Sequence, residues 1–129
     1  MFNVTNMNHM FKGASTFSQD LSSWNTASVT NMNGMFGRTT NFNGDISTWN
    51  VSKVTNMSVI FEDASAFSAA NYDKLLDGWS KLSLQNNISF RAPPNYHCNV
   101  AARNILIDTY GWSIFGDTEG TNTQCNPTP

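Results

Sequence analysis

The side chains that could do acid/base chemistry are few, and most of them lie in the second half of the chain. His97, Asp108, Asp117 and Glu119 could supply a general acid or base, and an enzyme would need one or more of them to converge with an activated nucleophile. The sequence shows no catalytic constellation that would bring this about. We therefore expect a protein that is not an enzyme and that has no catalytic residues and no cofactor.

The two cysteines, Cys98 and Cys125, are 27 positions apart, and their even number favours a disulfide. Closing a loop of that size stabilises a fold by roughly 3 to 4 kcal/mol in the chain-entropy estimate. Such a bond implies an oxidising compartment. The alternative is a metal site that includes the nearby His97, but a structural zinc ion takes four ligands and His9 is the only other histidine.

Asp20 and Asp45 are candidates for a metal site, because they occupy equivalent places in a repeated sequence. Stacking at strand spacing, ~4.8 Å, would bring two carboxylates close together, which costs energy without compensation. Backbone N–H groups of the adjoining turns are the expected partners. A calcium ion is the alternative, although Ca²⁺ takes six to eight oxygens and Ala70 stands at the third equivalent place.

The sequence repeats itself on a 25-residue step from its start to about residue 68. Val, Thr, Asn and Met recur together three times, two Phe positions recur three times, and Asp, Leu or Ile, and Trp recur twice. The sets are Val4/Val29/Val54, Thr5/Thr30/Thr55, Asn6/Asn31/Asn56, Met7/Met32/Met57, Phe11/Phe36/Phe61, Phe17/Phe42/Phe67, Asp20/Asp45, Leu21/Ile46 and Trp24/Trp49. A period of 20 to 29 residues is typical of leucine-rich-repeat proteins.

Each repeat is expected to contain one short helical turn. Val29, Met32, Met35 and Phe36 follow a helical spacing, which places them on one apolar stripe. Thr30 is the expected N-cap of this turn. Gly37, and Gly13 in the preceding repeat, are expected to end it in a left-handed conformation.

A short strand is expected later in the repeat, where Ile46 lies between polar residues and Trp49 closes the segment. Stacked repeats would pair such strands in parallel and align the apolar residues in continuous columns. The predicted fold is an α/β solenoid of leucine-rich-repeat-like coils. The repeated Asn residues are expected to bond the backbone of their own turn and of the neighbouring coil.

The remainder of the chain predicts a helix-containing C-terminal cap over residues 69–116 and a disulfide-tethered tail over residues 117–129, in one structural domain with the repeat array of residues 1–68. One amphipathic helix is predicted by Tyr72, Leu75, Leu76 and Trp79, and a second, ending at Gly111, by Ala102, Ile105, Leu106 and Thr109. Strands are expected at Ile88 and Phe90 and at Trp112 and Ile114.

Composition limits the possible partners. Charged residues make up only 12% of the chain, about half the usual ~25%, and Asn, Ser and Thr supply the polar surface instead, which suggests an extracellular setting. The net charge of −2 and the seven scattered Lys and Arg residues exclude a nucleic-acid interface. No apolar run reaches the length of a membrane span.

The three repeats resemble those of the BspA-like leucine-rich surface proteins, a bacterial surface-protein repeat family. The strings are "NVTNMNHMFKGASTFSQDLSSWN", "SVTNMNGMFGRTTNFNGDISTWN" and "KVTNMSVIFEDASAFS", and the segments "FSAANYDKLLDGWSKLSLQNNISF" and "AARNILIDTYGWSI" are similar to the family's closing unit. The cysteine pair and the extension through Pro129 depart from the pattern. The resemblance implies a surface-exposed protein connected with adhesion and carries over no catalytic residues.

The expected function is therefore a secreted or cell-surface adhesion module that binds a protein or a glycan. The alternative is a structural subunit or rigid spacer of a surface fibre, assembled through the repeat ends. Because residues Phe2 to Phe11 form a first coil without an N-terminal cap, we expect upstream repeats or another chain to cover it, and self-association is one possibility. Four sequons could carry glycans in a glycosylating host, at Asn3, Asn50, Asn56 and Asn87.

Overall fold

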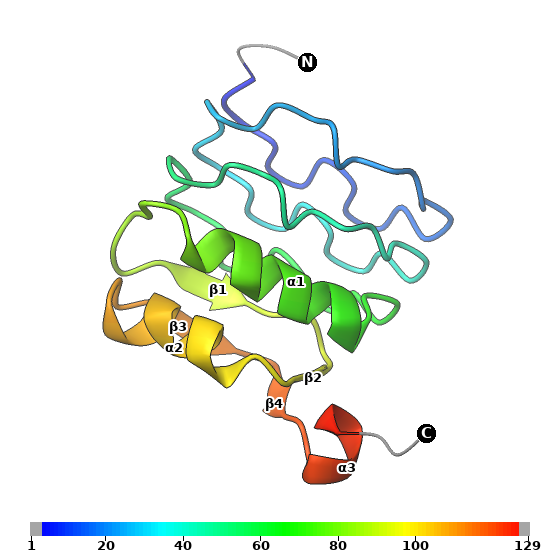
Figure 1. Cartoon of the computed structure of the whole chain (residues 1–129). Coiled ribbons are helices and arrows are strands. Elements are labelled where there is room, and N and C mark those ends of the chain that lie inside the picture. Colours follow the sequence, from blue (N-terminus) through cyan, green and yellow to red (C-terminus); the bar gives the residue numbers. More distant parts are fainter. Residues whose placement is uncertain (1–3, 127–129) are drawn as a thin grey trace.

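A computed structural model of the chain describes residues 4–126. Within this range the regular elements all lie in the C-terminal half: α1 (Ala69–Ser80), β1 (Ser89–Arg91), β2 (Tyr96–His97), α2 (Val100–Asp108), β3 (Ser113–Phe115), β4 (Thr118–Glu119) and α3 (Asn122–Cys125). β1 pairs with β3 and β2 pairs with β4, both in parallel. Figure 1 shows the repeats layered above this part of the chain.

The repeats form three successive turns of chain that lie one above the other (Figure 1). We call them the first coil (residues 4–28), the second coil (29–53) and the third coil (54–68). Parallel bridges join Asn6 to Asn31 and Asn31 to Asn56, so equivalent residues lie one coil apart. The 25-residue period of the sequence is therefore also the period of the backbone pairing.

Backbone hydrogen bonds between the coils have a consistent direction. Met7 donates its N–H to the carbonyl of Asn31 at 2.8 Å, and Met32 donates in the same way to Asn56 at 2.8 Å. In the opposite direction, Thr30 and Thr55 each donate to the Thr carbonyl one coil earlier. The coils are thus held together mainly by N–H groups that point towards the C-terminal end of the stack.

The core between the coils is a double column of aromatic rings. Phe36 lies between its equivalents Phe11 and Phe61, with ring centroids 5.8 and 5.5 Å away, and it stacks on Phe42 at 4.4 Å. Phe36, Phe42 and Phe61 are fully buried. Burial of these rings, at roughly 25 cal/mol per Å² of apolar surface, is the main term that stabilises the stack.

The regular elements predicted inside the repeat are not formed. Residues 33–38 make hydrogen-bonded turns, such as Met35 to Met32 and Gly37 to Gly34, instead of a helix. The strand predicted around Ile46 is also absent, and the inter-coil bridges occur at Asn31 instead. The apolar residues were assigned correctly to the core, because a sequence of tight turns can bury the same stripe as a helix.

Of the predicted caps of that turn, those at Thr30 and Gly37 are wrong. The Thr30 hydroxyl is 3.2 Å from the carbonyl of Thr5 and donates to it, so it links two coils instead of capping a helix. Gly13 has a positive φ of 74° as predicted, but its equivalent one period later is Arg38, with φ 59°. Gly37 is not among the residues with positive φ.

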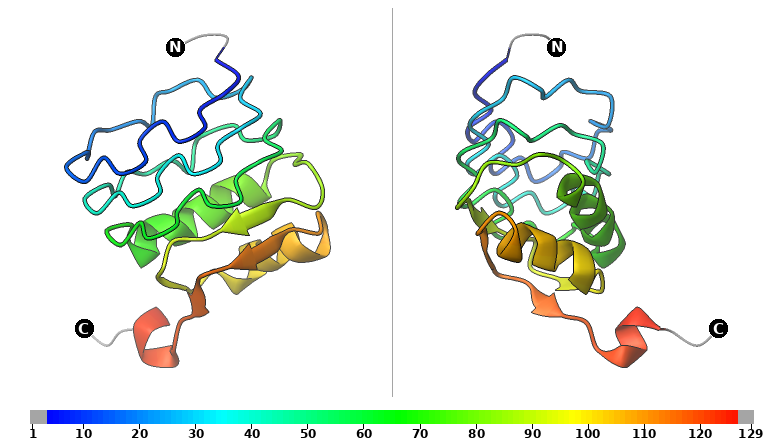
Figure 2. Two further views of the ribbon diagram at one scale, coloured as in Figure 1. Left: turned by 180° about the vertical axis from the view of Figure 1, so that it is seen from behind. Right: turned by 60° about the vertical axis from the view of Figure 1, so that its left-hand side comes forward.

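The helices and strands predicted after the repeats are mostly confirmed. The four residues of the first predicted helix are all buried on one face of α1. α2 buries Ala102 and Leu106, whereas Ile105 is 40% exposed and Thr109 lies beyond the helix, so the second stripe is narrower than predicted. Figure 2 shows α1 and α2 side by side on one face, with β1 and β3 on the other.

Gly78 permits the close approach of α1 to the second coil. A Cβ added there would lie 2.2 Å from the carbonyl oxygen of Ser47, which is backbone and cannot turn away. Elsewhere in a helix interior, Gly→Ala is favourable by about 1 kcal/mol. Here we expect Gly78→Ala to lower the free energy of unfolding by about 1–3 kcal/mol, since α1 must move away from the second coil.

Urea unfolding of the purified variant measures this change. Gly13→Ala is an unsuitable control because of its positive φ, so Lys74→Ala, at an exposed position of α1, serves instead. An unchanged or increased stability of Gly78→Ala would show that the contact with Ser47 is not tight.

Candidate functional site

A polar groove of about 500 Å³ crosses one side of the stack where the first coil, the second coil and α1 meet. Two successive coils supply equivalent loops to it, and α1 supplies one amide. The groove is lined by Ser18, Gln19, Asp20, Ser22, Asn41, Asn43, Gly44, Asp45 and Asn71. Apart from Gly44, the lining residues carry hydroxyl, amide or carboxylate groups, and no Lys or Arg is among them.

Asp20 and Asp45 are the charged groups of the groove. Each carboxylate accepts a backbone N–H two residues on, from Ser22 and from Ser47, at 2.9 Å in both cases. This confirms the predicted backbone partners. Hydrogen bonds from the backbone and hydroxyl of Ser22 lower the pKa of Asp20, and those from the hydroxyl and backbone of Ser47 lower the pKa of Asp45. The groove therefore carries two carboxylates that stay ionised at neutral pH.

Asn43 and Asn71 fix the wall of the groove that lies against α1. The side chain of Asn71 donates to the carbonyl and to the Oδ1 of Asn43, at 2.9 and 3.1 Å. Asn43 Oδ1 also accepts the N–H of Ser68, the residue that caps α1. The start of α1 is thus tied to the second coil, which gives the groove one rigid edge.

Other groove side chains are free to meet a ligand. Within residues 4–126, Ser18, Gln19 and Asn41 form no side-chain hydrogen bond with the rest of the chain. Their hydroxyl and amide groups can both donate and accept. The same range contains no group of three or more His, Cys, Asp or Glu side chains that could hold a metal ion.

Of the four predicted acid/base residues, two lie together in the C-terminal part of the chain. Asp117 and His97 are brought together, with His97 Nδ1 3.0 Å from Asp117 Oδ2 but not aligned for a hydrogen bond. Asp117 also accepts Tyr72 Oη at 2.6 Å and both Nε and an Nη of Arg103, at 2.9 and 3.0 Å. We call Tyr72, His97, Arg103 and Asp117 the cap cluster.

The cap cluster is buried, and its charges are paired with each other. Burial alone would raise the pKa of Asp117, but hydrogen bonds from Arg103 and Tyr72 outweigh it and hold this pKa below its ordinary value. Burial and the same carboxylate raise the pKa of Tyr72. Burial also opposes the charge of Arg103, yet the bond to Asp117 outweighs this and raises its pKa.

This geometry makes the cap cluster a cross-link between elements. It joins α1 through Tyr72, α2 through Arg103 and β2 through His97 to the segment before β4. Glu119 lies beside it in β4, paired in register with His97, whereas Asp108 is exposed at the end of α2. The prediction named His97 and Asp117 for acid/base chemistry, assigned Tyr72 to the apolar stripe of the first helix only, and did not name Arg103.

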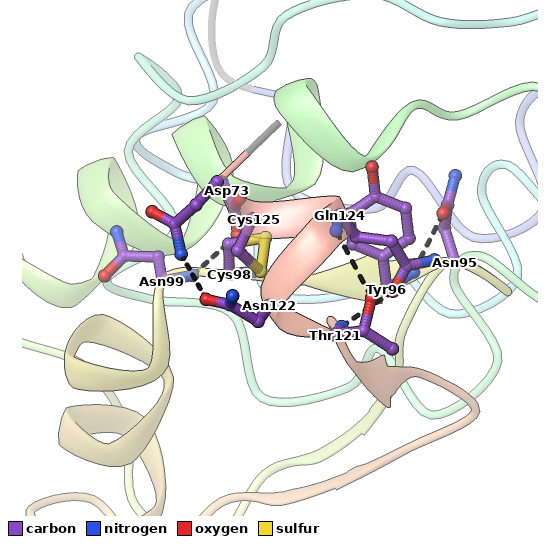
Figure 3. Close-up of a disulfide and its surroundings, with 10 residues drawn as sticks. Asp73, Asn95, Tyr96, Cys98, Asn99, Thr121, Asn122, Gln124 and Cys125 are labelled. Atoms are coloured by element: carbon purple, nitrogen blue, oxygen red, sulfur yellow. Dashed lines mark hydrogen bonds between the residues drawn. A yellow bond between two sulfur atoms is a disulfide. The ribbon is translucent and has the colours of Figure 1, made fainter. Parts of the chain in front are cut away.

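The tail is fastened by the two cysteines (Figure 3). Cys98 and Cys125 form a disulfide. Asp73 of α1 accepts the N–H groups of Cys98 and Asn99, each at 2.9 Å, so the bond is anchored to the cap. α3 buries no residue of its own, and we infer that the disulfide is what holds it in place.

Three of the four sequon residues lie among the described residues, and Asn3 lies outside them. Asn50 and Asn56 are exposed, and each accepts a nearby backbone N–H with its side chain, from Ser52 and from Ser58. Asn87 is exposed on a turn with φ 61°. Among these three sequons, Asn87 is the one whose side chain forms no hydrogen bond with the described part of the chain.

These features define the class of protein as a repeat protein whose 25-residue units stack by parallel backbone pairing and end in a small α/β unit. The chain belongs to the family described as "Mycoplasma protein of unknown function, DUF285", which matches residues 1–89. No curated protein and no solved structure matches the chain. None of the helices in residues 4–126 is both long and apolar enough to span a membrane.

Proposed function

We propose that the chain is a non-enzymatic interaction module of a leucine-rich-repeat solenoid, related to the BspA-like surface proteins, that acts in adhesion at a cell surface or after secretion. The observation that carries the proposal is the polar groove, in which equivalent loops of two coils present similar groups side by side. A ligand with regularly spaced hydroxyl or amide groups would meet one carboxylate in each coil, that of Asp20 and that of Asp45.

The composition of the groove favours a glycan or a polar protein segment. Carboxylates and amides are the usual partners of vicinal hydroxyls, and Asp20 and Asp45 can each use their second oxygen for such a bond. Because both are ionised and no basic residue lines the groove, the ligand should be neutral or basic. Acidic glycans would be repelled.

An oxidising setting agrees with the disulfide and with the mainly uncharged polar surface. The cap cluster supports the non-enzymatic part of the proposal, since Asp117 is 1% exposed and its oxygens are already occupied by Tyr72 and Arg103.

The test is a binding screen with the intact chain against immobilised neutral, basic and acidic glycans and extracellular proteins. We expect Asp20→Asn combined with Asp45→Asn to weaken binding about tenfold or more, as loss of charge-assisted hydrogen bonds does. Asp108→Asn, which removes an exposed carboxylate on α2, is the matched control and should bind normally.

Two results would contradict the proposal. Undiminished binding by the double variant would place the ligand elsewhere, and a preference for acidic glycans would be incompatible with the charge of the groove.

A further inference from the structure

The first coil has one face whose residues are less buried than their equivalents in the second coil. Phe11, Phe17 and Trp24 are only partly buried, whereas Phe36, Phe42 and Trp49 are at most 1% exposed. Met10 is 40% exposed and its equivalent Met35 is fully buried. We call this surface the upper face. The second coil shows what a covered upper face looks like.

Backbone groups on the upper face are also missing the partners that their equivalents have. In the second coil the carbonyls of Asn31, Asn33, Met35 and Gly37 accept N–H groups of the first coil at 2.8–2.9 Å. Among residues 4–126, no backbone N–H donates to the equivalent carbonyls of the first coil, which belong to Asn6, Asn8, Met10 and Lys12.

The Trp residues show the same pattern. Trp49 donates its indole N–H to the carbonyl of Leu21, and Trp79 and Trp112 donate to Ile46 and Gln85, each to the unit before it. Trp24 makes no such bond within the described part of the chain. The upper face is therefore apolar, presents four acceptor carbonyls in a row and includes one indole donor.

We propose that the upper face is a docking surface for one further coil of the same repeat, added in parallel. Such a coil would present N–H groups to the four carbonyls, a carbonyl to the indole of Trp24, and Phe and Met side chains to the exposed rings. This proposal is independent of the groove and of the function proposed for it.

The hydrogen-bond pattern distinguishes this occupant from a second copy of the chain. Two upper faces placed together would oppose carbonyl rows to each other and leave them unsatisfied, which is costly for buried backbone groups. At the opposite end of the molecule, a polar tail and α3 follow β3, and α3 buries none of its residues. A repeat coil supplies N–H donors at alternate positions along the chain, as Met7, His9 and Phe11 do towards the second coil.

The test joins a copy of residues 29–53 directly to Val4 and follows Trp24. The copy carries Trp49→Phe, so that it adds no tryptophan of its own at the uncovered end. Trp49, Trp79 and Trp112 are at most 3% exposed, so acrylamide quenching of the unmodified chain reports mainly on Trp24. We expect the added coil to reduce the quenching of Trp24 by about half and to be resistant to protease. It should also raise the melting temperature by roughly 5 °C or more.

The matched control is the same fusion, again with Trp49→Phe, that also carries Phe36→Ser and Phe42→Ser in the added copy only. It keeps the length, the tryptophans and most of the polar sequence. It should leave quenching and the melting temperature of the chain unchanged. A protease-sensitive intact copy, with quenching equal to that of the control, would overturn the proposal. It would also be overturned if sedimentation showed that the unmodified chain is a stable dimer in which Trp24 is already protected.

Discussion

Asp117→Asn should lower the free energy of unfolding by about 3 kcal/mol or more, which is a large part of the stability of a domain of this size. The substitution leaves the Arg103 guanidinium without its carboxylate and Tyr72 Oη without its charged acceptor. The Arg103 side chain is 20% exposed, so water can relieve part of the loss. The effect should therefore lie at the lower end of the 3–5 kcal/mol typical of broken buried pairs.

Two control variants separate the contributions. Tyr72→Phe removes one hydrogen bond to a charged group and should cost roughly 1.5–3 kcal/mol. Asp108→Asn removes an exposed carboxylate of α2 and should change the stability by less than about 0.5 kcal/mol. Urea unfolding of the three variants at neutral pH gives the comparison. A loss for Asp117→Asn no larger than that for Tyr72→Phe would show that Arg103 contributes little.

The ion pair of Asp117 and Arg103 also predicts a pH dependence of the free energy of unfolding. Because the folded-state pKa of Asp117 is below its ordinary value of about 3.9, the ionised form stabilises the fold at all pH values above that value. This contribution is lost as the pH falls through the lower, folded-state pKa. Stability of the unmodified chain should fall more steeply than that of Asp117→Asn below about pH 4.

The cap cluster shows what could not be predicted from the sequence. Tyr72 is 45 positions from Asp117, and Arg103 is 14 positions from it. Only the packing of α1 on α2 brings them to one carboxylate. Helical spacing placed Tyr72 in the core correctly, but it gave no indication that its hydroxyl would need an acceptor there.

The repeats were predictable in period but less so in local structure. A 25-residue register identifies which residues are buried, because equivalent positions such as Phe36 and Phe61 share one environment. It does not distinguish a helix from consecutive tight turns, since both bring every third or fourth residue to one side. Hydrogen bonds between coils, such as Thr30 to Thr5, outweighed local capping preferences.

The groove was partly predictable. Asp20 and Asp45 were identified as stacked carboxylates, and their backbone partners were expected from the turn chemistry of Asp. The contribution of Asn71 was not expected, because it depends on where α1 begins relative to the second coil.

Phe36→Ala should lower the free energy of unfolding by about 3–5 kcal/mol, the range for removing a buried aromatic side chain from a well-packed core. Phe36 has no exposed surface and lies near four rings, with centroids between 4.4 and 6.0 Å from its own: Phe11, Phe42, Trp49 and Phe61. The neighbouring coils are joined by backbone bonds on both sides of the cavity, and they can close it only partly.

Phe11→Ala is the matched variant, because Phe11 occupies the same position of the repeat in the first coil. Its ring contacts Phe17, Trp24 and Phe36, but the residue is only partly buried. Because less apolar surface is lost, the expected decrease in the free energy of unfolding is roughly half that for Phe36→Ala. Equal costs for the two variants would mean that the two ends of the stack are equally well covered. If a further coil docks on the upper face as proposed, Phe11→Ala in the fused protein should become as costly as Phe36→Ala, because both rings would then lie between two coils.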